Sequence, residues 1–127
     1  MNENEIAKVV VDAAFIIHKQ VGPGLLESAY QAFLVYELKK RGLFVESEIP
    51  MPVQYDGVQV DIGYRADLLI EKSVIVELKS VEKVIDIHKK QLLTYLKISD
   101  LRLGLLINFN VPLIKDGITR IANRFIE

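Results

Sequence analysis

The sequence of 127 residues contains no cysteine and no tryptophan. Without cysteine the chain has no disulfide, no thiolate zinc site and no thiol nucleophile. It also lacks an excess of either charge, since 16 Lys and Arg stand against 17 Asp and Glu, so a nucleic-acid partner would need a local basic patch. Half of the residues are hydrophobic, which excludes an intrinsically disordered chain.

Long apolar runs, internal repeats and Pro/Gly/Ser-rich linkers are also missing. No apolar run approaches the ~18 residues that a membrane span needs. The first five residues carry acids where a signal peptide needs basic residues. We therefore expect a soluble, cytoplasmic protein without a membrane partner, folded as one domain over residues 1–127.

The hydrophobic periodicity predicts an α/β fold, a mixed sheet flanked by helices. Strict alternation and short apolar runs indicate strands, and recurrence every three to four residues indicates helices. Asp56-Gly57 is typical of a hairpin turn, and two prolines make the strand before it an edge strand or an irregular one. The tail, 113–125, is expected to form a final hairpin or a short edge strand. The predicted helices are 4–20, 25–41 and 86–98, and the predicted strands are 44–55, 58–70, 74–79 and 103–109.

The strands 58–70 and 74–79 bring two acids together in this prediction. If residues 71–73 form the loop of their hairpin, Ile70 pairs with Val74, and counting back pairs Asp67 with Glu77. Directly opposed residues have Cβ atoms ~4.5–5.5 Å apart. Two carboxylates at that distance repel each other unless they share a proton, approach the neighbouring Lys79 or bind a divalent metal.

A plain surface hairpin with a charged outer face is the alternative interpretation. Alternation places Ala66 on the face of Leu68, opposite Asp67, and places Leu69 and Ile75 on the face of the acids. That face is therefore not simply exposed to water.

Glu27 and Gln91 are further candidates on helices. Glu27 lies at the head of an apolar stripe that continues through Tyr30, where it either complements the helix N-terminus or belongs to a site. Gln91 shares a helical stripe with His88 and Tyr95. The two histidines, His18 and His88, have no metal-ligating partner at helical spacing, which argues against a histidine zinc site.

The stretch Gly24-Leu25-Leu26-Glu27-Ser28-Ala29-Tyr30 resembles the motif that names the bacterial GxxExxY proteins, which belong to the PD-(D/E)XK nuclease-like superfamily. As a set and in this order, the matching segments are specific to that family. The further segments are Tyr55-Asp56-Gly57, Arg65-Ala66-Asp67-Leu68-Leu69, Val76-Glu77-Leu78-Lys79, Gln91-Leu92-Leu93-Thr94-Tyr95-Leu96 and Gly104-Leu105-Leu106-Ile107-Asn108-Phe109.

The resemblance implies a restriction-endonuclease-like core, α-β-β-β-α-β, with one extra helix at the N-terminus. Asp67 resembles the metal-binding Asp of the second core strand, and Glu77 and Lys79 resemble the (D/E)XK pair. Glu27 resembles the helix-borne acid of many members, and Gln91 resembles the polar residue of the following helix.

The resemblance further implies a metal-dependent nuclease that hydrolyses phosphodiester bonds, with DNA as the expected substrate and low intrinsic sequence specificity. Asp67, Glu77, Glu27 and the Leu78 carbonyl would supply the oxygen ligands that Mg²⁺ or Mn²⁺ prefers. Lys79 would orient the attacking water or stabilise the transition state.

A non-enzymatic or partner-dependent module of the same fold, which binds nucleic acid or protein, is the alternative. A protein partner that supplies specificity and a second copy of this chain are both compatible with the sequence. A basic cluster near the Gln91 helix is the expected contact for phosphates, with a solvated helix face as the alternative interpretation. Its members are Lys83, Lys89, Lys90, Lys97 and Arg102.

Overall fold

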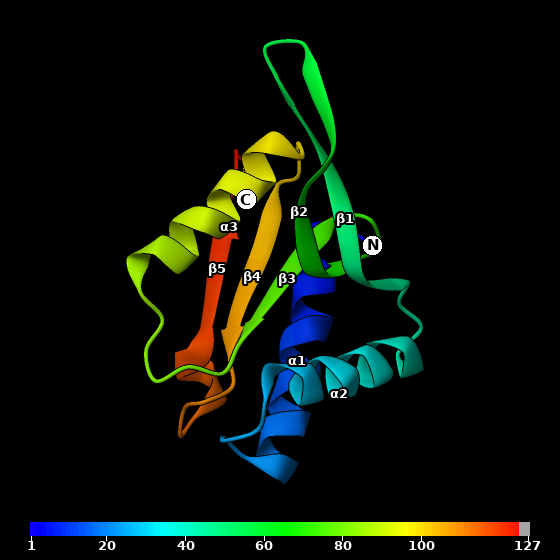
Figure 1. Ribbon diagram of the computed structural model, residues 1–127. Helices are drawn as coiled ribbons and strands as arrows, with labels where there is room; N and C mark the ends of the chain where they lie inside the picture. The colour runs from blue at the N-terminus through cyan, green and yellow to red at the C-terminus, as the bar shows by residue number, and fades with distance from the viewer. Residues whose placement is uncertain (125–127) are drawn as a thin grey trace.

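Five strands form one mixed sheet in the computed structural model, which describes residues 1–124 (Figure 1). Their order is β1-β2-β3-β4-β5, and every neighbouring pair is antiparallel except β3 and β4, which are parallel. Helices flank the sheet, so the predicted α/β class and the mixed sheet are confirmed. The strands are β1 Val45–Tyr55, β2 Val58–Ile70, β3 Val74–Lys79, β4 Leu103–Asn108 and β5 Ile118–Ala122.

Two hydrophobic clusters hold the helices against the sheet. Helices α1 (Glu3–Val21) and α2 (Glu27–Lys40) bury their apolar stripes against one face, where the larger cluster lies. Helix α3 (Asp86–Ile98) packs through Leu92 and Leu96 on the smaller cluster. Helix α1 begins with a capping box, since Asn2 Oδ1 accepts from the Glu5 N–H and Glu5 Oε1 accepts from the Asn2 N–H.

Helix α3 forms the crossover that the parallel β3–β4 pair requires. Strand β4 is buried along its whole length, as a strand in the middle of a sheet should be. Gly104 allows α3 to approach, because a Cβ there would lie 2.9 Å from Leu92 Cδ1. In the tail, the 3₁₀ helix η1 (Ile114–Gly117) leads into β5, which is the expected short edge strand. Phe125, the last residue of that predicted tail, lies outside the described residues.

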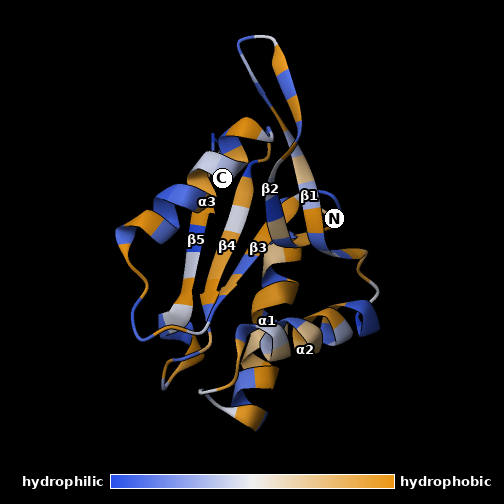
Figure 2. Cartoon of the chain, viewed as in Figure 1, coloured by the Kyte–Doolittle hydropathy of each residue, from blue (hydrophilic) through white to orange (hydrophobic). Residues whose placement is uncertain are grey.

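The β1–β2 hairpin extends well beyond the rest of the sheet (Figures 1 and 2). Its tip is the predicted Asp56-Gly57 turn, with φ angles of 49° and 78°. Apolar side chains stay exposed along it, and no Lys or Arg occurs between Arg41 and Arg65. Strand β1 is an edge strand, as its prolines predict. The exposed apolar residues of this hairpin are Tyr55, Val58, Val60 and Ile62.

The alternation of faces along β2 breaks at Asp67. Leu68 belongs to the cluster under α1 and α2, whereas Ala66 belongs to the cluster under α3. The prediction that Ala66 shares a face with Leu68 is therefore wrong. The change of face coincides with a local departure from strand geometry in the hairpin, since Glu48, the β1 residue nearest Asp67 in the register, has a φ of 51°.

Tyr30, the last residue of the GxxExxY stretch, is a structural anchor. It is fully buried, and its ring stacks on Phe109 with centroids 4.3 Å apart. Its hydroxyl donates to the Gly22 carbonyl at 2.6 Å and accepts from the Leu25 N–H at 3.1 Å. Tyr30 thereby fixes the loop that leads into α2 and sets the position of Glu27.

We expect Tyr30→Phe to lower the free energy of unfolding by about 2 kcal/mol, because two backbone groups of the loop lose their partner while the ring stack remains. Urea denaturation measures this change. Tyr36→Phe is the matched control, since Tyr36 lies on the same helix and is 65% exposed. Equal stability of the two variants would contradict the anchoring role.

Candidate functional site

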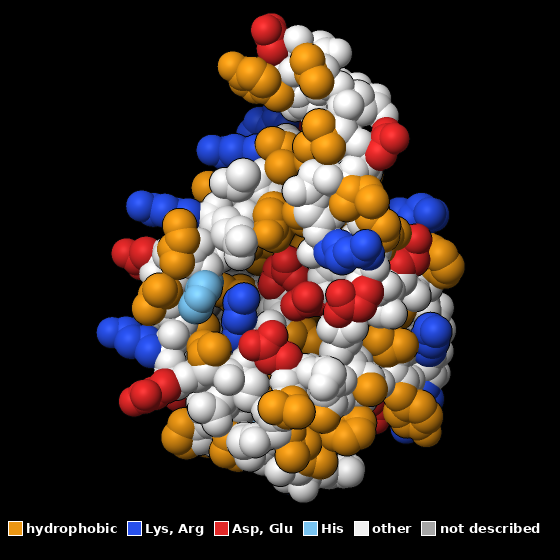
Figure 3. Space-filling model, viewed as in Figure 1, with side chains coloured by type: hydrophobic (Ala, Val, Ile, Leu, Met, Phe, Trp, Pro, Cys, Tyr) orange, Lys and Arg blue, Asp and Glu red, His pale blue; other side chains and the backbone are white. Residues whose placement is uncertain are grey.

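A cavity of about 180 Å³ lies where β3 ends, between the start of α2 and helix α3. Acidic side chains gather near the centre of this face of the molecule, with basic side chains on either side (Figure 3). All five residues predicted to be catalytic line this cavity together. Its lining consists of Glu27, Arg65, Asp67, Glu77, Lys79, His88, Gln91, Leu92, Tyr95 and Leu106.

Asp67 and Glu77 are adjacent and exchange hydrogen bonds with the backbone. The pairing of Ile70 with Val74 continues through two further pairs, so the next position places Asp67 beside Glu77 and confirms the predicted register. Glu77 Oε2 accepts from the Asp67 N–H at 3.0 Å, and Asp67 Oδ2 accepts from the Leu78 N–H at 2.8 Å. Carboxylates thus replace main-chain carbonyls as acceptors at the end of this strand pair.

Burial raises the pKa of Glu77 to about 8, and the negative charge of Asp67 acts in the same direction. The Asp67 N–H bond and the positive charge of Lys79 act in the opposite direction. A hydrogen bond between the two carboxyl groups adds to the rise. The two carboxyl groups therefore hold a proton near neutral pH. A shared proton is one of the three ways, with Lys79 and a divalent metal, in which the repulsion between the two carboxylates can be relieved.

Two stacked tyrosines lie close to the acids, and one of them, Tyr95, lines the cavity. The rings of Tyr64 and Tyr95 lie 3.9 Å apart at an interplanar angle of 5°, and the Tyr64 hydroxyl hydrogen-bonds Ser99 Oγ at 2.6 Å. Burial raises the pKa of Tyr95, and the charges of Glu77 and Asp67 raise it further. Tyr95 thus lies in the electrostatic environment of the acids.

Glu27 does not cap α2 with its side chain. The N-cap residue is Leu26, and Glu27 Oε2 instead accepts from the Ser80 N–H, directly after β3, at 3.4 Å. Ser80 Oγ donates to the Leu25 carbonyl at 2.6 Å, which ties the start of α2 to the end of β3. These contacts favour a place for Glu27 in the site.

The acid pair suits Mg²⁺ or Mn²⁺. Mg²⁺ keeps several waters and is held by one or two carboxylates, and the donors of Asp67 and Glu77 are hard oxygens. In residues 1–124 no group of three His, Asp or Glu side chains is close enough to hold an ion, so Glu27 does not complete such a group. The predicted ligand roles of Glu27 and of the Leu78 carbonyl stay predictions.

The predicted phosphate-binding cluster lies outside this cavity. All five of its residues are exposed, and Lys83 and Lys89 line a separate polar cavity with Asn108 and Asp116. The cluster residues are Lys83, Lys89, Lys90, Lys97 and Arg102.

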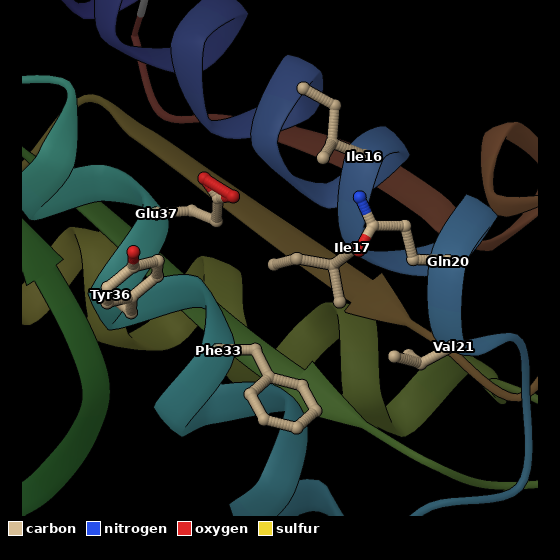
Figure 4. A pocket seen from close by; sticks show the side chains of 7 residues that line it. All are labelled: Ile16, Ile17, Gln20, Val21, Phe33, Tyr36 and Glu37. Atoms are coloured by element: carbon tan, nitrogen blue, oxygen red, sulfur yellow. The ribbon is translucent and has the colours of Figure 1, made fainter.

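An apolar cavity of about 220 Å³ lies between α1 and α2 (Figure 4). Its one acid, Glu37, forms an ion pair with Arg41 at 2.7 Å and is therefore not free for chemistry. The cavity with Asp67 and Glu77 is thus the better candidate for a reactive site.

Besides Leu92 and Leu106, three polar residues of the lining have no role in the site predicted from the sequence: Arg65, His88 and Tyr95. Tyr95 lies one helical turn after Gln91, and His88 lies one turn before it, so helical spacing was the available signal for both. Arg65 precedes Asp67 by two residues on β2, a spacing that alone does not indicate a shared cavity.

The chain matches the family model of the PD-(D/E)XK nuclease superfamily over residues 4–121 and belongs to that superfamily. The mixed sheet and the order of its elements agree with the restriction-endonuclease-like core of this class. No curated protein and no solved structure gives a significant match. The narrower GxxExxY assignment stays a prediction. No helix in the described part of the chain is long and apolar enough to cross a membrane.

In EDTA, we expect the free energy of unfolding to fall as the pH rises from about 4.5 to about 8. In that window folded Glu77 keeps a proton that the unfolded chain has released, so the slope reaches at most about 1.4 kcal/mol per pH unit. Glu77→Gln removes this titration and retains an amide oxygen for the Asp67 N–H. The free energy of unfolding of Glu77→Gln minus that of the wild type should therefore increase as the pH rises. Denaturant titrations at several pH values measure this difference.

Glu82→Gln is the control, because Glu82 is exposed and lies outside the acid pair. Parallel pH profiles of wild type and Glu77→Gln would show that Glu77 has an ordinary pKa.

Proposed function

We propose that this protein is a metal-dependent nuclease that hydrolyses phosphodiester bonds of DNA with low intrinsic sequence specificity. One observation supports this proposal above all others. Glu77 accepts from the Asp67 N–H and Asp67 accepts from the Leu78 N–H, so the two acids lie side by side, and Lys79 lines the same cavity. Membership of the nuclease superfamily supports a nuclease-type activity at this site.

Each residue has a distinct task in the proposed reaction. Asp67 and Glu77 would hold Mg²⁺ or Mn²⁺, which supplies charge neutralisation at the phosphate and lowers the pKa of a bound water. Lys79 holds its ammonium near the acids, where it orients the attacking water or stabilises the charge that develops on the phosphate oxygens. Gln91, one turn before Tyr95, positions the substrate or the water.

Low intrinsic specificity is inferred from the surface near the cavity. The exposed basic residues around α3, from Lys83 to Arg102, are suited to phosphates rather than to base edges. A partner would then supply any sequence preference.

A partner-dependent binding module is the second candidate, and the β1–β2 hairpin favours it. The hairpin exposes Tyr55 to 83% together with three aliphatic side chains, and it carries no basic residue before Arg65. Such a surface is suited to a protein, including a second copy of this chain, rather than to nucleic acid. The net charge of −1 agrees with this alternative.

We expect millimolar Mg²⁺ or Mn²⁺ to raise the melting temperature of the wild type, because an ion that binds only the folded state stabilises it. Glu77→Gln should lose this shift. Lys79→Ala should keep the shift but lose cleavage, since Lys79 is proposed to act on the water or the transition state. Differential scanning fluorimetry and gel assays on single-stranded, double-stranded and branched DNA and on RNA measure both effects.

Lys39→Ala, an exposed lysine of α2, should match the wild type in both assays. A metal shift without cleavage of any substrate would favour the binding module. Cleavage that survives Lys79→Ala combined with Glu77→Ala would place the activity elsewhere.

A further inference from the structure

Arg65 is a cation in the acidic cavity without an ion-pair partner. It is exposed on β2, and within residues 1–124 its guanidinium forms neither a hydrogen bond nor a salt bridge. Glu27, Asp67 and Glu77 line the same cavity, yet none of their carboxylates lies within 4.0 Å of it. An ion pair with these acids therefore does not hold the Arg65 side chain in place. The five N–H donors of its guanidinium remain available to a ligand.

His88 offers a second donor from another element. It lies in the first turn of α3, and its Nδ1 accepts the Ile85 N–H at 3.3 Å. In a neutral imidazole this bond leaves the proton on Nε2, because the nitrogen that accepts cannot also donate. His88 lines the cavity and therefore presents an N–H group on the side of α3.

The spacing along β2 separates Arg65 from the acid pair. Two residues of a strand span about 6.5 Å, so a phosphate held beside Asp67 lies about that far from the Arg65 backbone. At that separation the Arg65 guanidinium can bind the next phosphate of the strand while the acids hold the one at Asp67. Its planar guanidinium matches two phosphate oxygens at once, which a lysine cannot do.

We propose that Arg65, with His88 as a neutral second donor, binds the phosphate of a nucleic-acid strand that neighbours the scissile one. This assignment rests on the proposed nuclease function. It requires a substrate with at least two consecutive phosphates, so an internal phosphodiester of a polynucleotide is recognised and a mononucleotide is not.

The test is fluorescence anisotropy with labelled single-stranded and duplex 20-residue DNA, in Ca²⁺ at pH 8, over a range of salt concentrations, with gels to confirm intact DNA. Arg65→Ala should weaken binding about tenfold and reduce the slope of log Kd against log salt by about 0.7 to 0.9, because one phosphate contact is lost. Arg65→Lys should restore the slope but only part of the affinity.

His88→Ala should weaken binding with an unchanged salt slope, because a neutral donor releases no counterion. Lys8→Ala, an exposed cation on α1, should leave the affinity unchanged. In cleavage assays with Mn²⁺, Arg65→Ala should raise KM more than it lowers kcat.

If the wild type binds and cuts DNA while Arg65→Ala matches it in affinity and salt slope, the assignment of Arg65 is wrong and the proposed function stands. A loss of affinity with an unchanged slope and a lower melting temperature would make Arg65 structural. If the wild type neither binds nor cuts any polynucleotide, the proposed function itself fails.

Discussion

The exchange of hydrogen bonds between Asp67, Glu77 and the backbone is the interaction on which the site depends. Each carboxylate accepts an N–H at the point where β2 and β3 cease to pair regularly. The backbone N–H groups of Asp67 and Leu78 are thereby hydrogen-bonded without a carbonyl partner on the neighbouring strand. The same bonds fix two acids that repel each other side by side. In this arrangement burial raises the pKa of Glu77, and the negative charge of Asp67 raises it further.

The surrounding structure holds this pair from two sides. Tyr30 secures the loop before α2 through Gly22 and Leu25, and Ser80 joins that loop to the end of β3. On the other side the stacked tyrosines of β2 and α3 lie close to the acids, and Tyr95 lines the cavity. The GxxExxY stretch therefore combines two kinds of residue, since its tyrosine is structural and its glutamate lies in the cavity.

Much of the fold could be predicted because its determinants are local. Turn residues and periodicity predicted β3 and α3 with their observed bounds, and the length of the 71–73 loop set the pairing of Asp67 with Glu77. The reversal of faces at Asp67 could not be predicted, because it coincides with a left-handed residue on the neighbouring strand, Glu48, that no turn motif in the sequence indicates. Likewise, Arg65 carries no local pattern that indicates the cavity, which forms only when α3 lies over the sheet.

The parallel pairing of β3 with β4 also has a consequence for how the protein folds. Parallel neighbours cannot be joined by a tight turn, so this pair forms only after the intervening segment, with α3, has closed a long loop. Residues of the cavity come from α2, β2, β3, α3 and β4, so the cavity is complete only once this loop has closed. A chain still emerging from the ribosome therefore has no complete acidic cavity until β4 has been synthesised.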